Sequence, residues 1–419
     1  MATICVHWPR LGPYHVARLR AAHELLAGSG DRLVLLETAE SDATYAWELQ
    51  RDELPFPRVR AFEDRQLETI SVGEMVSGVH AALDRIDPDA VAITSYSHPD
   101  ARASLTWCRR RRRTAVLMTD SKADDAPRVA WREWVKRQLV TQYDAAIVAG
   151  TAHAAYARAL GMPATHTFRP VDVVDNQRYA NGADAARAEP LAAGESIRLE
   201  IGRPYFLSVA RMIERKNLAT LIRAYGGYRR ACRDAGTAPW SLVLVGDGPE
   251  RDRLRQLADE ACDGGVMFAG FRQTDELVTF LGLAECLVHP ARMDQWGLVV
   301  NEAMAAGLPV LVSRAAGCAD DLVVDGVTGH RFDPDSADEL ASLLSAVSAL
   351  PPAERQRMAN AGRQRIERYR PKDFAIALRD AVTAGSQRSR RGLSPTAWLV
   401  TSALQMASRD ARAFHSIPD

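Results

Sequence analysis

Two carboxylates stand eight residues apart in the segment 293–313, which reads MDQWGLVVNEAMAAGLPVLVS. Asp294 precedes a Trp-Gly pair, and Glu302 lies two turns into the apolar-periodic run that follows. A helix opening at Gly297 would offer unpaired N–H groups and a positive dipole end to a phosphate. Glu302 could accept hydrogen bonds from sugar hydroxyls. The segment therefore suits a ligand with phosphates and hydroxyls, and an ordinary amphipathic helix with an exposed glutamate is the alternative.

Two cations and a glycine turn follow predicted strands in the same half of the chain. Arg211 comes directly after the apolar segment 205–210, and Lys216 lies five residues later. Arginine binds phosphate oxygens in a planar, bidentate way and lysine as a mobile point charge, so the pair suits a diphosphate. A solvated basic turn is the alternative. Gly246 ends the apolar segment 241–246 in a Gly-Asp-Gly-Pro turn, which is by itself a common link between strand and helix.

Short apolar segments alternate with helical patterns along most of the chain. Strands are expected at 3–8, 32–37, 89–95, 114–120, 144–150, 205–210, 241–246, 266–269, 286–289 and 310–313. Helices are expected near 15–27, 72–85, 101–112, 128–143, 151–160, 218–234, 250–262, 275–281, 337–350, 366–384 and 395–407. This alternation is typical of an α/β protein whose parallel sheets are covered on both faces.

The pattern falls into two doubly wound halves with a cleft expected between them. The segment 181–203 is rich in Ala, Gly and Glu with weak periodicity, and we interpret it as a linker. We place the domains at 1–190 and 191–370. The remaining residues, 371–419, are expected to form a helical tail that packs back across both domains.

The composition is that of an ordinary soluble globular protein. Of 419 residues, 47% are hydrophobic and 25% are charged, and the formal net charge is +0. No overall field favours a nucleic-acid partner. The six cysteines lack metal-binding spacing and are expected to be reduced core residues. Because neither a signal peptide nor a bilayer-spanning apolar run is visible, we expect a cytoplasmic protein.

Five segments between Tyr205 and Leu350 occur in the order and spacing of a known family. They read SVARMIERKN, LVLVGDGPERDRL, FAGF, DQWGLVVNEAMAAGLPVLVS and GVTGHRFDPDSADELA. The chain therefore resembles the retaining glycosyltransferases of family 4, the glycosyl transferases group 1. The resemblance implies the GT-B fold, in which two Rossmann-like domains flank an interdomain cleft. It also implies sugar transfer from a nucleoside-diphosphate donor to an acceptor hydroxyl with retention of anomeric configuration.

The resemblance assigns donor binding to the second half of the chain. It implies that Arg211 and Lys216 bind the donor diphosphate and stabilise it as the leaving group. It implies that Glu302 binds the ribose hydroxyls and that Asp294 faces the transferred sugar. The other donor-binding candidates are Gly246 and the backbone of Trp296, Gly297, Leu298 and Val299.

Two positions depart from the family pattern. The family carries Glu at the position of Asp294, and the aspartate carboxylate reaches less far because it is one methylene shorter. Many relatives have a histidine at the end of the strand expected at 114–120, where this chain has Met118. A methionine cannot usefully hydrogen-bond a sugar hydroxyl. Asp120 is then the catalytic candidate at this strand end, and a cap of the following loop is the alternative.

The first half of the chain is less clearly marked. Family members often have paired glycines after the first strand, and this chain has only Gly12 there. Gly12 is therefore a donor-binding candidate, and His15 beside it is an acceptor-side candidate. His98 follows another predicted strand and could also line the acceptor side, although a solvated loop histidine is the alternative.

Two basic segments have a pattern that also occurs on membrane-binding proteins. Arg109–Arg113 is a run of five arginines, for which we favour a solvated helix terminus. Trp131 and Trp134 lie among Arg132 and other basic residues, as in helices that lie on a membrane. We favour inward packing of the two tryptophans. Peripheral membrane contact is thus left open but not favoured.

We expect a hexosyltransferase without a cofactor or an obligatory metal, because Arg211 and Lys216 supply positive charge at the diphosphate. The family favours a UDP-linked donor. The acceptor is expected to be a hydroxyl-bearing carbohydrate, lipid-linked sugar or small natural product. The alternatives are a nucleotide-sugar epimerase on the same fold and a non-catalytic nucleotide-sugar-binding protein.

Overall fold

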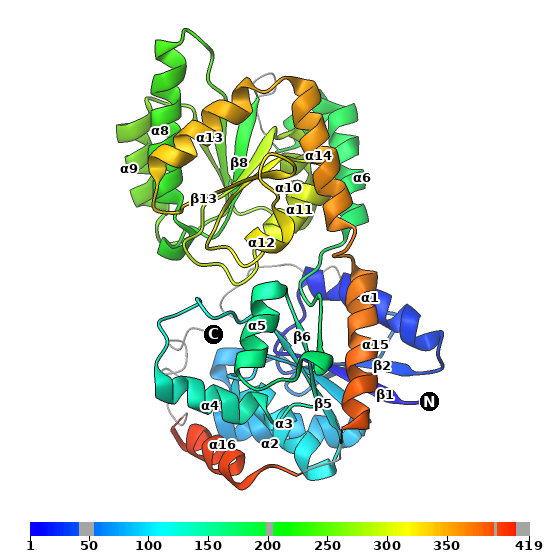
Figure 1. Cartoon of the computed structure of the whole chain (residues 1–419). Coiled ribbons are helices and arrows are strands. Elements are labelled where there is room, and N and C mark those ends of the chain that lie inside the picture. The colour runs from blue at the N-terminus through cyan, green and yellow to red at the C-terminus, as the bar shows by residue number, and fades with distance from the viewer. Residues whose placement is uncertain (42–53, 198–203, 389–391, 408–419) are drawn as a thin grey trace. The chain divides into compact units, whose positions relative to one another are not determined.

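The computed structural model describes residues 1–41, 54–197, 204–388 and 392–407, without the side chains of 405–407 (Figure 1). The chain divides into two compact units. Unit 1 contains Met1–Val173 together with Pro371–Asp419, and unit 2 contains Val174–Arg370. Each unit is built on one parallel sheet with helices on its faces.

Unit 1 contains a seven-stranded sheet in the order β3-β2-β1-β4-β5-β6-β7. Its strands are β1 (Thr3–Trp8), β2 (Arg32–Glu37), β3 (Arg58–Arg60), β4 (Ala90–Thr94), β5 (Thr114–Thr119), β6 (Ala145–Val148) and β7 (Thr167–Phe168). Its helices are α1 (Pro13–Ala27), α2 (Val72–Ile86), α3 (Pro99–Arg111), α4 (Ala130–Val140), α5 (Thr151–Ala159), α15 (Pro371–Gln387) and α16 (Pro395–Ala407). The central strands are apolar and buried almost throughout, as expected for a sheet covered on both faces.

Unit 2 contains a six-stranded sheet in the order β10-β9-β8-β11-β12-β13. Its strands are β8 (Tyr205–Val209), β9 (Ser241–Val245), β10 (Val266–Gly270), β11 (Cys286–His289), β12 (Val310–Ser313) and β13 (Gly329–Phe332). Its helices are α6 (Asn176–Ala188), α7 (Pro190–Ile197), α8 (Leu218–Asp234), α9 (Arg251–Cys262), α10 (Thr274–Leu283), α11 (Leu298–Ala306), α12 (Ala319–Leu322), α13 (Ala337–Ala349) and α14 (Pro352–Ile366). In both sheets the strand order reverses beside the first strand of the unit, which is where open α/β sheets bind ligands.

The segment 181–203, which we interpreted as a linker, is largely helical. Helix α6 begins after Asp175, whose carboxylate accepts a hydrogen bond from the Arg178 backbone N–H at 3.1 Å. Helix α6 packs against α10 and α11, and α7 packs against α10. The linker interpretation is therefore wrong over 181–197, and 198–203 lie outside the described residues. The unit boundary falls before α6, at Val173, and not at residue 190.

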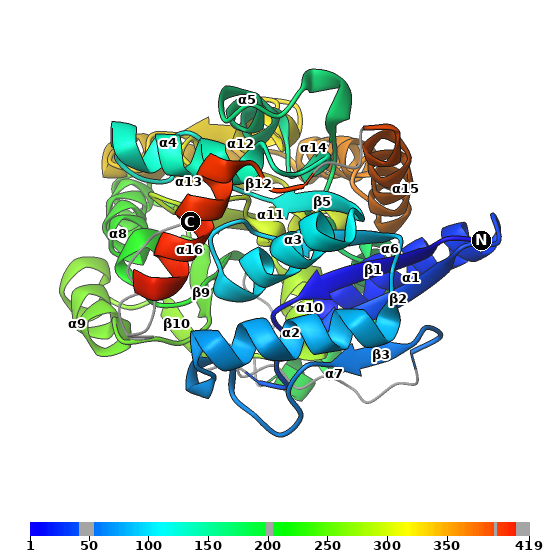
Figure 2. The same ribbon diagram turned by 90° about the horizontal axis from the view of Figure 1, so that it is seen from below.

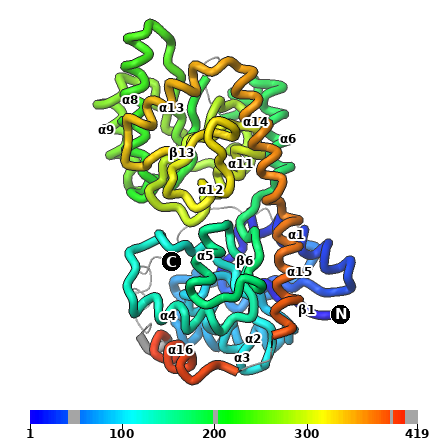
Figure 3. The backbone as a smooth tube through the Cα atoms, in the orientation of Figure 1, coloured from blue at the N-terminus to red at the C-terminus, as the bar shows by residue number. Residues whose placement is uncertain are grey.

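The end of the chain belongs to the packing of unit 1. Helix α15 runs beside α1 (Figure 3) and also contacts β5 and β6. Its apolar face buries Phe374, Leu378 and Ala381, and the Phe374 ring lies 6.5 Å from the Trp8 ring. Helix α16 packs against α4. Helix α15 therefore covers part of the first sheet, and α16 lies against one of the covering helices.

Helix α4 does not turn its tryptophans inward. Trp131 is 63% exposed and Trp134 is 49% exposed, so the expectation of inward packing is wrong. The inner face of the helix is instead formed by Val135, Leu139 and Val140, which pack on the unit 1 core. The three-residue spacing of the tryptophans places both on the opposite, outer side.

All six cysteines are buried and none forms a disulfide, in agreement with their expected core role. Within the described ranges, no helix combines the length and apolar character that crossing a membrane requires.

Candidate functional site

The centre of the candidate site in unit 2 is an ion pair between Lys216 and Asp294. Strands β8 and β11 are neighbours at the point where the strand order reverses. Lys216 lies in the single turn Glu214–Lys216 that follows β8, and Asp294 lies in the loop that follows β11. The Lys216 Nζ is 2.6 Å from the Asp294 Oδ2. The structure thus brings together two predicted site residues that are 78 positions apart.

His289 is a third member of this cluster and was given no role from the sequence. It ends β11, is buried, and places its Nε2 2.9 Å from the same Asp294 oxygen. Burial favours the protonated acid, but the contacts with His289 and Lys216 outweigh it and hold the pKa of Asp294 well below its usual range. Asp294 is therefore an ionised carboxylate that lies between the nitrogens of Lys216 and His289.

The start of helix α11 lies directly after this loop. Gly297 is the N-cap residue, with φ at +102°, and a Cβ there would lie 3.2 Å from the His289 Nε2. Leu298 and Val299 in the first turn are half-buried. The Trp296 side chain is buried and donates its indole N–H to Asn301 at 2.9 Å. The Trp296 side chain is thus turned away from a ligand, whereas its backbone and the N–H groups of the first helical turn are suited to contact one.

Glu302 is more enclosed than an exposed helix residue would be. Its side chain lies on the buried face of α11 and the residue is 1% exposed. The Tyr179 hydroxyl on α6 donates a hydrogen bond to its Oε1 at 3.0 Å. The alternative of an exposed glutamate on an ordinary amphipathic helix is therefore wrong. The ribose-binding role of Glu302 stays a prediction.

The Gly-Asp-Gly-Pro turn after β9 is joined to the loop after β8. Gly246 has φ at +132°, and a Cβ there would lie 1.9 Å from the Ala210 carbonyl oxygen. The Met212 N–H donates to the Asp247 carbonyl at 2.8 Å. Because only glycine allows this approach, the turn holds the exposed Arg211 segment at the carboxyl edge of the sheet.

Asn217 connects the Lys216 turn to two other loops and was missed from the sequence. It is buried in the left-handed conformation, with φ at +57°, between Lys216 and helix α8. Its Nδ2 donates to the Pro290 carbonyl at 3.0 Å and to the Pro334 carbonyl at 2.8 Å. Asparagine tolerates this conformation better than most residues, so its place just before a predicted helix was a usable signal.

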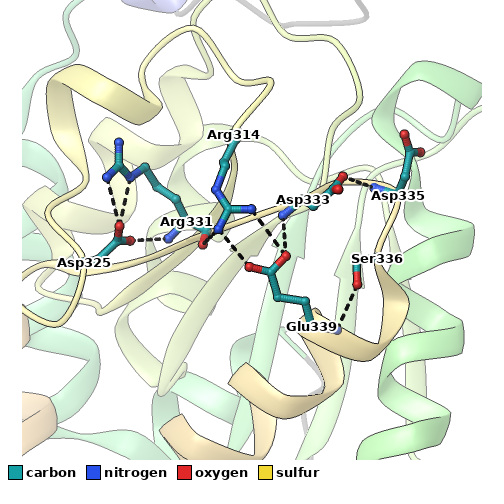
Figure 4. A network of polar contacts seen from close by, with 7 residues as sticks. All are labelled: Arg314, Asp325, Arg331, Asp333, Asp335, Ser336 and Glu339. Carbon is teal, nitrogen blue, oxygen red and sulfur yellow. Dashed lines mark hydrogen bonds and ion pairs between the residues drawn. The ribbon is translucent and has the colours of Figure 1, made fainter.

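The turn Asp333–Asp335 is fixed by a network of polar contacts (Figure 4). Glu339 accepts a hydrogen bond from the Asp333 N–H at 2.8 Å and one from the Arg314 Nη2 at 2.8 Å. The Asp335 carboxylate in turn accepts from the Arg292 Nε at 2.6 Å. Because Arg292 lies two residues before Asp294, this network steadies the loop that carries the central carboxylate.

Gly12 and His15 lie at the carboxyl end of β1 in unit 1. Gly12 is the N-cap residue of α1, and its N–H donates to the His15 Nδ1 at 2.9 Å. The His15 ring stacks on the Trp8 ring at 4.3 Å. Burial and then the charge of Arg18 lower the pKa of His15 to about 3. His15 is therefore neutral at ordinary pH.

Asp120 and His98 follow the neighbouring strands β5 and β4 at the same edge of the sheet. Asp120 is half-buried, while His98 is exposed at the N-cap of α3. Near them, the buried Arg18 lies 3.2 Å from the Asp172 carboxylate and also feels the charge of Asp120. The unit 1 candidates thus share one sheet edge, but their acceptor-side or catalytic roles stay predictions.

The sequence family described as Glycosyl transferases group 1 matches residues 195–365. These residues contain the whole Lys216–Asp294 cluster, α11 and the Gly246 turn. This part of the chain is similar to the glycosyl transferases group 1 family. Its match begins near the end of α7 and ends in α14, so it covers most of unit 2.

Curated relatives match just under half of this chain. A GDP-mannose-dependent alpha-(1-6)-phosphatidylinositol monomannoside mannosyltransferase from Mycobacterium tuberculosis is 32% identical over 200 residues, which are 45% of this chain and 48% of that protein. A glycogen synthase from the same organism is 34% identical over 190 residues, which are 44% and 42% of the two chains. The chain spans about half the length of the curated relatives it matches.

Solved structures match nearly the whole chain. Sucrose-phosphate synthase from Thermosynechococcus elongatus has a TM-score of 0.69 at 20% identity, covering 90% of this chain and 97% of that one. HepE from Anabaena, solved with UDP and glucose, also has a TM-score of 0.69, at 17% identity, covering 91% and 100%. With its two parallel-sheet Rossmann-like units, the chain has the GT-B fold expected from the sequence.

Proposed function

We propose that this protein is a hexosyltransferase-type glycosyltransferase. It moves a sugar from a nucleoside-diphosphate donor to an acceptor hydroxyl with retention of the anomeric configuration. The observation that carries the proposal is the Lys216–Asp294 pair at 2.6 Å, placed beside the first turn of α11. This arrangement puts a mobile cation and unpaired backbone N–H groups at one edge of the sheet.

In the proposed reaction Lys216 and Arg211 bind the donor diphosphate. Bond cleavage between sugar and diphosphate leaves negative charge on the departing phosphate. Preorganised positive groups stabilise that charge more in the transition state than in the ground state. The helix N-terminus at Gly297 adds its dipole to the two side chains. The reaction then has no obligatory metal or other cofactor, because these groups supply the charge.

The carboxylates of Asp294 and Glu302 contact different parts of the donor. Asp294 is ionised and lies next to Lys216, so it faces the sugar where the sugar joins the diphosphate. Glu302, the fifth residue of α11, accepts hydrogen bonds from the ribose hydroxyls. In unit 1, the backbone at Gly12 contacts the donor. Asp120 takes part in catalysis, and His15 and His98 lie on the acceptor side.

The favoured donor is UDP-linked, with a GDP-linked sugar as its main competitor. Support for each comes from similar proteins, since HepE was solved with UDP and glucose and the mycobacterial mannosyltransferase is named for GDP-mannose. The acceptor is a hydroxyl of a carbohydrate, a lipid-linked sugar or a small natural product. The site of action is the cytoplasm.

A donor panel followed by a transfer assay tests the proposal. UDP-, GDP- and ADP-sugars are compared by thermal shift, where a ligand at a hundred times its dissociation constant adds about 2.7 kcal/mol of stability. The stabilising donor is then incubated with acceptor candidates. Release of the nucleoside diphosphate with sugar transfer supports the proposal. A new sugar nucleotide formed without acceptor would instead indicate an epimerase, and binding without turnover would indicate a non-catalytic binding protein.

A further inference from the structure

Two helices of unit 1 carry a concentration of exposed hydrophobic side chains. Ten large hydrophobic residues are exposed in the described part of the chain, and half of them lie on or directly before α4 and on α16. These five are Val129 (37%), Trp131 (63%), Trp134 (49%), Trp398 (58%) and Leu399 (61%). Helices α4 and α16 pack against each other and lie side by side (Figure 2). We call the five residues, together with Arg132 and Arg137, the α4–α16 surface.

The fold of unit 1 does not need these side chains for its core. Helix α16 turns Ala397, Val400 and Leu404 inward at helical spacing, and the last two pack on the main core cluster. Trp398 and Leu399 fall on its other side. Large exposed hydrophobic residues gathered in this way mark an interaction surface more often than chance scatter does.

The α4–α16 surface is also positively charged. Arg132 and Arg137 are exposed, and among the described residues neither has an acidic partner within 4.0 Å. The Arg132 guanidinium lies 5.4 Å from the Trp131 ring centroid. Glu133 is the only acidic residue in the sequence of α4, and it pairs with Arg128 and Lys136, while the sequence of α16 has no charged residue. The surface therefore combines tryptophan with unpaired arginine.

The more obvious basic run, Arg109–Arg113, has no exposed large hydrophobic residue, and three of its five arginines are paired. Arg109 is buried and paired with Asp144. Arg111 lies 2.7 Å from Asp84, and Arg113 lies 2.8 Å from both Asp87 and Asp89. Arg110 and Arg112 remain exposed without an acidic partner among the described residues, but no exposed tryptophan accompanies them.

We propose that the α4–α16 surface binds the surface of an anionic lipid bilayer. Tryptophan has an apolar ring with one polar N–H and concentrates where headgroups meet acyl chains. Arginine binds lipid phosphates and gains from the negative potential of anionic leaflets. The combination of three exposed tryptophans and two unpaired arginines fits that boundary in both polarity and charge. This assignment rests on unit 1 alone and does not depend on the proposed transfer reaction.

Vesicle co-sedimentation of the full chain tests the assignment. Vesicles of phosphatidylcholine are compared with vesicles that also contain phosphatidylglycerol. We expect binding to the anionic vesicles that weakens with salt. Trp131→Ala/Trp134→Ala and Trp398→Ala/Leu399→Ala should each lower the partition coefficient by about tenfold or more. Arg132→Gln/Arg137→Gln should lower it by about fivefold for each charge removed.

Matched variants in unit 2 control for general hydrophobicity and charge. Val324→Ala/Val327→Ala removes two exposed apolar residues at the same spacing as the tryptophans, and Arg223→Gln/Arg230→Gln removes two exposed arginines of α8. Both should bind vesicles as the unmodified chain does, and melting temperatures verify folding. Equal binding by the tryptophan variants, or no binding of the unmodified chain to either vesicle, would overturn the proposal. A dimer that the tryptophan variants dissociate, without vesicle binding, would assign the surface to a second copy instead.

Discussion

The ammonium group of Lys216 lies 2.6 Å from the carboxylate of Asp294, although the two residues come from different loops. The pair holds the lysine at the carboxyl edge of the sheet, where a diphosphate is expected to bind. A donor phosphate must therefore share or replace Asp294 as the partner of Lys216. Asp294 then both orients the Lys216 ammonium group and is expected to face the transferred sugar.

Replacing Lys216 with Ala should lower kcat/KM for the donor by about 10² to 10³, because a preorganised positive group is lost at the leaving phosphate. It should also destabilise the fold, since a largely buried carboxylate loses its partner. Adding Asp294→Asn should restore part of the melting temperature but not the activity. Lys216→Arg, which keeps the charge, serves as the control. A Lys216→Ala enzyme with near-normal turnover would remove the lysine from the proposed mechanism.

Replacing Tyr179 with Phe should weaken donor binding by about tenfold, because the Glu302 carboxylate loses a hydrogen bond that positions it. Glu302→Ala should lower turnover by orders of magnitude. Titration of donor binding by calorimetry measures the first effect, and a transfer assay measures the second. The matched control is Tyr205→Phe, whose buried hydroxyl donates to the Phe280 carbonyl away from Glu302. If Tyr205→Phe and Tyr179→Phe weaken donor binding equally, the loss reflects a general loss of stability and not the contact with Glu302.

Replacing Gly246 with Ala should destabilise unit 2 by several kcal/mol and abolish donor binding. The new Cβ would lie 1.9 Å from a backbone oxygen of the Arg211 loop, which would have to move. Gly236→Ala is the control, because Gly236 also has a positive φ, +68°, but has open space around its Cβ position. That change should cost only about 1 kcal/mol. Urea unfolding curves of the two variants give the comparison, and equal losses would contradict the steric argument.

The neutral state of His15 should make stability depend on pH. Its pKa falls from the ordinary value of 6.5 in the unfolded chain to about 3 in the folded one. Between these values the unfolded chain binds a proton that the folded chain does not, so lowering the pH favours unfolding. The stability that His15 contributes is therefore complete above about pH 6.5 and is lost progressively below it. A His15→Gln variant should show a shallower fall in the free energy of unfolding, and parallel curves would refute this.

The regular elements of the central sheets could be predicted because their signals are local. The strand 286–289 and the helix 218–234 have the predicted bounds, since each is a clear apolar or periodic run. Helices α6 and α7 were missed because their Ala-rich sequences show weak periodicity and are stabilised by α10. The short strands β3, β7 and β13 were missed because a few residues carry little pattern.

The site could be predicted only in part, because its contacts join residues that are far apart in the sequence. Lys216 and Asp294 were each candidates, but their pairing follows from the order of β8 and β11 in the sheet. His289 looked like an ordinary strand end until its ring was placed against Asp294. The exposure of Trp131 and Trp134 depends on which side of α4 packs on the core. Val135 and Leu139 form that side, so the tryptophans point outward.

The placement of α15 in unit 1 has a consequence for how the protein is made. Unit 2 is one continuous stretch of the chain, so all of it is synthesised before α15. Strands β1 to β7 must then wait, with the surface under α15 uncovered, until residues 371–387 are synthesised. Contacts between such distant segments form slowly and leave apolar surface open to aggregation. Ribosome-bound chains ending before α15 should therefore depend on chaperones in a way that longer chains do not.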